Sequence, residues 1–315
     1  MKREVMELSI RNNKRLGYIS YVLFLAALTL IIGIVHSVSA EETTRPTDGH
    51  IFYVDASVPS GGNGSMDSPF SEIRDAIIAA EDGDTLRVWE GEYYWIRLNI
   101  NKTLRIIGNG TEKPVVKGFK ISKDNVLIEN LSFTRGILIY QGSNNLTIRN
   151  CSIEGASIGI DVSWVRNISI IDCSIKNCSS SGISGGFLES NIINCLFENC
   201  EDGIWVGGDE VIIENCMFRN NSQGIVISSY RRRFTVVNCS FERNELAIRC
   251  PEDTILKDNQ FIDNDQNITV SKEHDIGAMN AMNAIDWNIV FGGIIVGVII
   301  LPFLMTLDHW LLKRK

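Results

Sequence analysis

Four side chains in the middle of the chain have the chemistry that binds sugars. Asp161, Trp205 and Arg249 each stand third in a short phrase that reads Gly-Ile-x-Val or a close variant. Tyr140 directly follows another copy of this phrase. If the phrase forms a strand, its third residue points away from the core, because side chains alternate between the two faces of a strand. An indole can stack on a sugar ring while charged groups hydrogen-bond its hydroxyls, so the pattern predicts a glycan-binding strip.

Hydrolysis of a glycan by a pair of carboxyl groups would require a second acidic group near Asp161. Inverting glycosidases hold two carboxyl groups roughly 6.5 to 9.5 Å apart, and retaining ones hold them about 5 Å apart. Asp161 is the only acidic residue in the third position of the phrase. Carboxylates in loops, such as Asp202, Asp209 and Glu210, could still join such a site. Catalysis therefore stays open as an alternative to binding.

The eight cysteines fall into columns and not into a metal-binding cluster. Five of them follow a recurrent Asn or Asp, in a slot that Leu131 fills in an earlier repeat: Cys151, Cys173, Cys195, Cys216 and Cys239. Cys178 and Cys200 form a second column, and Cys250 takes a valine position of other repeats. The four histidines all lie outside the repeats, and a buried thiolate is unfavourable. We predict stacked, buried thiols, with disulfides between neighbouring repeats as the alternative.

A repeat with a period in the low twenties positions all of these residues. Its polar turn residue recurs every 20 to 23 residues, at Asn130, Asn150, Asp172, Asn194, Asn215, Asn238 and Asp258. The third position of the Gly-Ile-x-Val phrase recurs in step, at Leu138, Asp161, Ser184, Trp205, Val226, Arg249 and Thr269. Short β-branched runs with this period are typical of a parallel β-solenoid. We expect residues 51–272 to form roughly nine coils whose stacked Asn side chains hydrogen-bond to one another.

The stretch before the coils has a different pattern. Residues 60–68 form a glycine-rich loop, and a helix is predicted to follow, with Ser68 as N-cap and Pro69 at the first position. Gly83 marks its end. Because an open solenoid end exposes unpaired strands, we interpret this helix as an N-terminal cap.

The N-terminal segment has the features of export. Residues 1–40 contain five basic residues, then the apolar run Leu16 to Val35, then the small residues Val38, Ser39 and Ala40. This order is typical of a cleaved signal peptide, and the length of the run leaves an uncleaved signal anchor as the alternative. Residues 41–50 are polar and read as a linker.

The C-terminal segment predicts a membrane anchor. Residues 288–307 carry no charge and are long enough to span a bilayer. Residues 273–287 precede them as a juxtamembrane segment, and the basic tail 308–315 follows them. By the positive-inside rule, we expect a cell-membrane protein with an extracytoplasmic body and a cytoplasmic C-terminus.

The charge of the body argues against nucleic acid as a partner. The chain carries a net charge of -8 at pH 7, and without its two basic ends the body carries about -13. Nucleic-acid-binding domains normally present a basic face. The expected partners are the membrane, through residues 288–307, and a glycan or another surface protein.

The quoted motifs also resemble a known family. FYVDAS, SGGNGS, SPFSEIRDAI, GDTLRVWEGEYY and LRIIGNG, followed by N-C-S-F and G-I-x-V coils, are similar to right-handed parallel β-helix repeat proteins of the pectin-lyase-like superfamily. The resemblance covers residues 51–272 and implies an all-β, right-handed parallel β-helix of the membrane-anchored surface type. This fold hosts lyases, hydrolases, epimerases, adhesins and accessory proteins, so it says little about function. Lyases of the family use calcium and a basic residue as general base; we expect no cofactor, with calcium as the one ion left open.

The expected role is surface interaction, with glycan binding as its most specific form. One alternative is a polysaccharide lyase or glycoside hydrolase, and another is an exported accessory protein that docks a membrane component. The observation that best separates them is whether acidic side chains converge beside Trp205.

Overall fold

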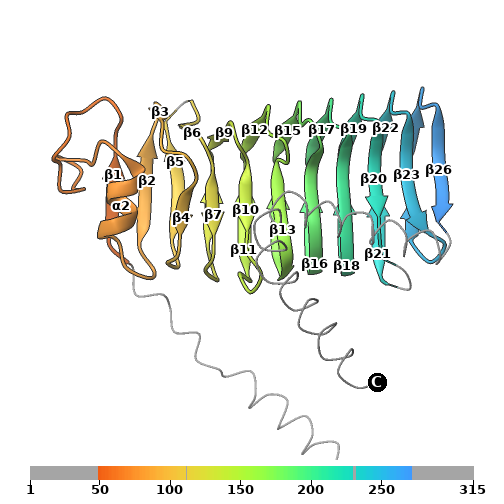
Figure 1. The fold of residues 1–315 in the computed structure, drawn as a ribbon, viewed down its shortest axis with the longest axis horizontal. Coiled ribbons are helices and arrows are strands. Elements are labelled where there is room, and N and C mark those ends of the chain that lie inside the picture. The colour runs from red at the N-terminus through yellow and green to blue at the C-terminus, as the bar shows by residue number, and fades with distance from the viewer. Residues whose placement is uncertain (1–48, 111, 230–231, 272–315) are drawn as a thin grey trace, which may run out of the picture. The chain divides into compact units, whose positions relative to one another are not determined.

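The computed structural model describes residues 49–110, 112–229 and 232–271 of the chain. In this part the chain winds into a parallel β-solenoid whose strands pair with their counterparts one coil away (Figure 1). No helix within these residues is long and apolar enough to cross a membrane. The predicted signal segment 1–40 and the predicted anchor 288–307 lie outside the described residues.

Three rows of parallel strands make up the coils. The first row contains β1 (Ile51–Val54), β2 (Thr85–Trp89), β5 (Arg105–Asn109), β8 (Leu127–Glu129), β11 (Leu146–Arg149), β14 (Ile168–Ile171), β21 (Phe234–Val237) and β24 (Ile255–Lys257). The second row contains β3 (Glu92–Tyr93), β6 (Val115–Val116), β9 (Ser132–Phe133), β12 (Ser152–Glu154), β15 (Ser174–Lys176), β17 (Leu196–Glu198), β19 (Met217–Arg219), β22 (Ser240–Glu242) and β25 (Gln260–Ile262). The third row contains β4 (Leu98–Ile100), β7 (Phe119–Ile121), β10 (Ile137–Ile139), β13 (Ile160–Arg166), β16 (Ser181–Ile193), β18 (Asp202–Glu214), β20 (Gln223–Ile227), β23 (Leu246–Pro251) and β26 (Gln266–Ser271).

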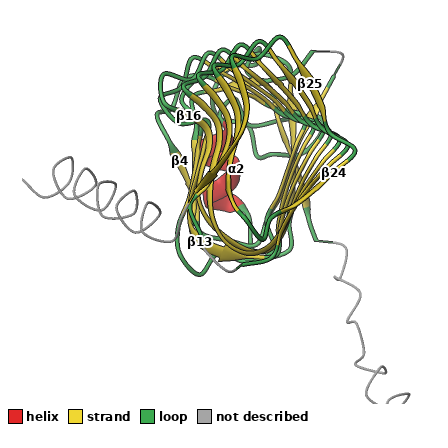
Figure 2. Cartoon of the chain, turned by 90° about the vertical axis from the view of Figure 1, so that its right-hand side faces the viewer, coloured by secondary structure: helices red, strands yellow, loops and turns green. Residues whose placement is uncertain are grey.

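The second row is a nine-stranded sheet, in agreement with the predicted number of coils. Strands β16 and β18 continue from the third row into the first, so these two rows form one 17-stranded sheet. Figure 2, which looks along the stack of coils, shows the rows enclosing a single interior. The all-β parallel solenoid predicted from the repeat is confirmed.

The interior is filled by equivalent residues stacked from coil to coil. The isoleucines of the Gly-Ile-x-Val phrase are buried and in register: Ile137, Ile160, Ile183, Ile204, Ile225 and Ile248. In the second row, Phe197, Phe218, Phe241 and Phe261 stack with successive ring centroids 5.0, 4.9 and 5.3 Å apart. Burial of these apolar side chains is the main stabilising contribution to the coils.

The recurrent Asn and Asp residues make the turns between the first and second rows. All seven adopt left-handed backbone, with φ between 50° and 58°. Asn tolerates this conformation better than other non-glycine residues. The Asn150 side-chain amide donates to Asn130 Oδ1 at 3.2 Å, and that of Asn194 donates to Asp172 Oδ1 at 3.1 Å. The predicted hydrogen bonds between stacked turn residues are confirmed.

The cysteine columns are part of the core. All eight cysteines are buried, and all are free thiols in this structure. The Cys195 thiol, 2% exposed, donates to the Ile193 carbonyl oxygen at 3.2 Å. Burial raises the pKa of the Cys151 thiol well above its usual range. The predicted inward position of the cysteines is confirmed.

The one helix in the described part of the chain is shorter than predicted. Helix α2 spans Ile73–Ala79 with Glu72 as N-cap, so the prediction of Ser68 as N-cap is wrong. The reason is strand pairing: Phe70 forms a parallel bridge with Val54 of β1, which keeps the preceding residues extended. The helix lies at the N-terminal end of the solenoid, beside β1 (Figure 1). Its buried residues, Ile73, Ala76 and Ile77, join the core.

Candidate functional site

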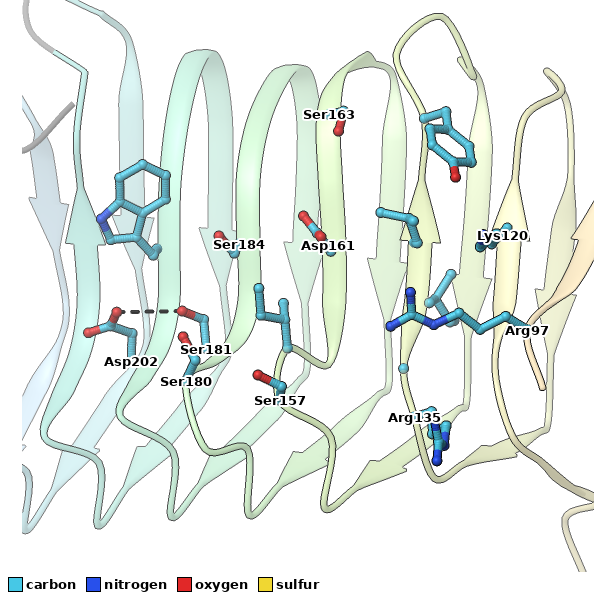
Figure 3. Close-up of a pocket in the computed structure, with 16 residues that line it drawn as sticks. Arg97, Lys120, Arg135, Ser157, Asp161, Ser163, Ser180, Ser181, Ser184 and Asp202 are labelled. Carbon is cyan, nitrogen blue, oxygen red and sulfur yellow. Dashed lines mark hydrogen bonds between the residues drawn. The ribbon is translucent and has the colours of Figure 1, made fainter. Parts of the chain in front are cut away.

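A groove with a volume of about 720 Å³ crosses the outer face of the third row (Figure 3). Its lining residues come from six successive coils, from Arg97 just before β4 to Trp205 on β18. Five strand spacings correspond to a length of about 24 Å. The groove therefore lies across the strands, parallel to the axis of the solenoid.

The predicted outward column forms the floor of this groove. Leu138 pairs with Asp161, Asp161 with Ser184, and Ser184 with Trp205, and all four line the groove. Tyr140, 41% exposed, lines it as well. The groove thus brings together three of the four residues predicted to bind sugar, namely Tyr140, Asp161 and Trp205.

Arg249 is the exception. It follows Trp205 in the column with Val226 between them, but it does not line the groove. Val226 is fully buried, so the column is not the continuous open strip that alternation predicts. Trp205 itself is half-buried and not freely exposed.

Two acidic residues line the groove, and both have raised pKa values. Burial raises the pKa of Asp161 to about 6, and the nearby Arg97 opposes this shift. Burial, with a smaller contribution from Glu201, raises the pKa of Asp202 to about 6. Two hydrogen bonds oppose the shift at Asp202: Gln223 Nε2 donates to Oδ1 at 3.0 Å, and Ser181 Oγ donates to Oδ2 at 3.5 Å.

The two carboxylates do not form a close pair. Asp161 pairs with Ser184 on β16, and Asp202 pairs with Ser181, three residues earlier on the same strand. From strand spacing and rise per residue, the Cα atoms of Asp161 and Asp202 are about 14 Å apart. Figure 3 shows Ser184 and Ser181 lying between them. This arrangement differs from the paired carboxyl groups of a glycosidase.

The opposite end of the groove is basic. Arg97, Lys120 and Arg135 line it, and Figure 3 shows them on the far side of Asp161 from Asp202. Sequence reasoning missed all three. Lys120 could have been found, because Gly118-Phe119-Lys120-Ile121 is a variant of the repeated phrase and Lys120 pairs with Leu138. Arg97 and Arg135 lie outside the strands, where the repeat gives no signal.

The remaining lining residues are mostly serines: Ser157, Ser163, Ser180, Ser181 and Ser184. Their hydroxyls can both donate and accept hydrogen bonds. Within the described residues, no group of three or more His, Cys, Asp or Glu side chains is arranged to hold a metal ion. The groove thus offers hydroxyls, two aromatic rings, carboxylates at one end and cations at the other.

Comparison with known proteins agrees with this architecture. The model of the family described as the right handed beta helix region matches residues 124–300. The chain belongs to the right-handed β-helix family. Among solved structures, this β-helix protein is similar to a rhamnogalacturonan lyase, with a TM-score of 0.57 and 14% identity over 68% of this chain and 74% of the lyase. It is also similar to XylC in its complex with xylose, with a TM-score of 0.51 and 11% identity over 70% of each chain.

At these identities, the similarity of the β-helix protein to solved structures establishes the fold alone. The resemblance to pectin-lyase-like β-helix proteins is confirmed at that level. No curated protein sequence matches the chain.

Proposed function

We propose that this β-helix protein binds an extended glycan along the groove between Arg97 and Trp205. The observation that supports the proposal best is the composition of one continuous groove, in which Tyr140 and Trp205 lie among five serines and charged groups. Sugar chains present both apolar ring faces and many hydroxyls, which aromatic rings and polar side chains recognise together.

The dimensions of the groove favour a chain-like ligand. A length of about 24 Å across the strands suits a polymer that lies along the solenoid axis. Pockets for drug-like ligands are mostly apolar with few polar groups, whereas 11 of the 16 residues that line this groove carry a hydroxyl or a charge. The negative body charge disfavours nucleic acid, which is the other common extended polymer.

We also propose that the protein binds its glycan at the cell surface. The support for this location is the sequence pattern of residues 1–40 and 288–307, which combine apolar runs with basic flanks. The glycan-binding body would then be extracytoplasmic and anchored by the C-terminal segment. Helix α2 is proposed to cap the N-terminal end of the solenoid, because its buried side joins the core.

Cleavage of the glycan is a second candidate function. It is supported by the raised pKa values of Asp161 and Asp202, since perturbed carboxyl groups in a groove are typical of catalytic sites. Lys120 and Arg97 supply basic side chains in the same groove. The separation of about 14 Å between the Cα atoms of the two aspartates argues against a two-carboxylate hydrolase.

A glycan array probed with the full-length chain in nanodiscs tests the proposal. Binding to a defined class of polysaccharide, without any shortening of the polymer, is the expected result. Binding to no glycan would overturn the proposal. Depolymerisation that is lost in both Asp161→Asn and Asp202→Asn would establish the second candidate in its place.

A further inference from the structure

Trp164 lies on the outside of β13 because the strand carries one extra residue. Val162 and Val165 both point inward, at 3% and 0% exposure, with two residues between them where regular alternation leaves one. The register with β16 shifts at this point, since Val162 pairs with Gly185 and Val165 with Phe187. This β-bulge turns both Ser163 and Trp164 outward, and bulges often re-aim side chains beside functional sites.

The backbone of Trp164 is in an unfavourable conformation. Its φ of 48° lies in the left-handed region, which bulky side chains rarely adopt. The side chain is 58% exposed, so burial of the indole does not compensate for the conformational cost. A strained residue that contributes little to the core is a reason to look for a functional role.

The indole of Trp164 rests on the next coil at Gly186. A Cβ atom at Gly186 would come within 2.6 Å of Trp164 Cδ2, 2.9 Å of Cε3 and 3.0 Å of Cε2. Three ring atoms at similar distances mean that the face of the ring covers the backbone of β16. Any side chain at position 186 would displace the ring, so this placement of the indole depends on glycine at position 186.

This position is adjacent to the groove. Ser163, the residue before Trp164, lines the groove. Gly186, under the indole, pairs with Gly207 on β18, two residues beyond Trp205. From strand spacing and rise per residue, the Cα atoms of Gly186 and Trp205 are about 8 Å apart. The two indoles therefore occur beside the same end of the groove.

We propose that Trp164 is a second sugar-stacking platform, which holds the glycan together with Trp205 at the end of the groove that contains Asp202. The bulge in β13 turns the indole outward, and Gly186 fixes its plane. This inference rests on the proposed glycan-binding function and assigns part of the specificity to a residue outside the Gly-Ile-x-Val column.

Titration calorimetry of the full-length chain in nanodiscs with an oligosaccharide from the array tests the inference. Trp164→Ala is expected to weaken binding by about ten-fold, and Trp164→Phe by less than about three-fold. Gly186→Ala keeps the indole but displaces it, and is expected to weaken binding as much as Trp164→Ala. Gly207→Ala is the matched control, since its Cβ would meet only the hydroxyls of Ser228 and Ser229, at 3.2 and 3.3 Å, and binding should be unchanged.

The outcomes separate the inference from the proposed function. Wild-type affinity in both Trp164→Ala and Gly186→Ala, together with weakened binding in Trp205→Ala, would overturn the inference and leave the proposed function standing. Absence of binding by the wild-type chain would overturn both. If Gly186→Ala does not fold, the comparison of Trp164→Ala with Trp164→Phe decides the question alone.

Discussion

The side-chain amide of Gln223 donates a hydrogen bond to the carboxylate of Asp202 from the next coil, at 3.0 Å. Within the described residues, the other end of this amide, Oε1, is buried without a hydrogen-bond partner. Gln223 thus orients a groove carboxylate while leaving one of its own polar atoms unsatisfied, which costs stability. The polar groups around the groove are therefore not arranged for stability alone.

Stability near the groove should depend on pH through Asp161. The folded-state pKa of about 6 lies above that of the unfolded chain, near 4, so the folded state binds more protons between these values. The free energy of unfolding should therefore fall as the pH rises from 4 to 6. Asp161→Asn removes this penalty and should stabilise the protein at pH 7 by about 1 to 3 kcal/mol, with no gain below pH 4, as measured by urea unfolding.

Asp265→Asn, on an exposed turn, is the control for this substitution. Its stability should match that of the wild type over the same pH range. A gain at Asp161→Asn that persists unchanged at pH 3.5 would show that the effect does not come from the charge.

Cys195 should behave as a core residue. Cys195→Ala should lower the free energy of unfolding by about 1 to 2 kcal/mol, because it leaves a small cavity and removes one weak hydrogen bond. Cys195→Asp should prevent folding, since it buries an unpaired charge. Thiol reagents should label the wild-type protein only after denaturation, and prompt labelling of the native protein would contradict the buried position.

Trp205 should contribute to binding but little to folding. Trp205→Ala is expected to weaken glycan binding by about 1 to 3 kcal/mol, because it removes a stacking surface in the groove. Asp161→Asn should weaken binding less, since the amide can still hydrogen-bond. Thr269→Ala, three coils beyond Trp205 in the same column, should leave the affinity measured by calorimetry unchanged. If Thr269→Ala and Trp205→Ala reduce the affinity equally, the groove is not the binding site.

Glycan binding should be independent of calcium. Calcium takes oxygen ligands at about 2.3 to 2.6 Å, and Cα atoms about 14 Å apart place Asp161 and Asp202 too far from each other to share one ion. Treatment with EDTA should therefore change the dissociation constant by less than about two-fold. A large loss of affinity that calcium restores would contradict this expectation.

The proposed topology predicts the accessibility of each part of the chain. In intact cells, a membrane-impermeant amine reagent should label lysines of the solenoid, and a tag placed after residue 315 should be inaccessible to antibody. Permeabilisation should expose the tag. Labelling of the solenoid only after permeabilisation would show that the body is not extracytoplasmic.

The repeat made most of the fold predictable. The spacing of Asn130, Asn150 and their successors fixes which residues stack, so the register, the inward isoleucines and the cysteine columns followed directly. The start of helix α2 could not be predicted from the sequence. Pairing of Phe70 with β1 outweighs the local preference of Ser68 and Pro69 for a helix start. Tertiary pairing is not visible in a local pattern.

The groove was predictable only where it coincides with the repeat. Asp161 and Trp205 occupy repeated positions, whereas Arg97 and Arg135 belong to turns whose paths the period does not determine. Trp164 was missed because strict alternation assigns it to the interior. Only the shift in register between Val162 and Val165 places it outside, and that shift depends on the glycines of the neighbouring coil.

Because the coils stack at a constant spacing, the number of coils determines the length of the groove. Each coil contacts mainly its two neighbours, so duplication or loss of a single repeat should leave the remaining coils folded. A repeat duplicated between β13 and β16 would move Trp205 away from Asp161 by about 4.8 Å. The length of glycan that such a protein can hold would therefore change in fixed steps, one strand spacing for each repeat gained or lost.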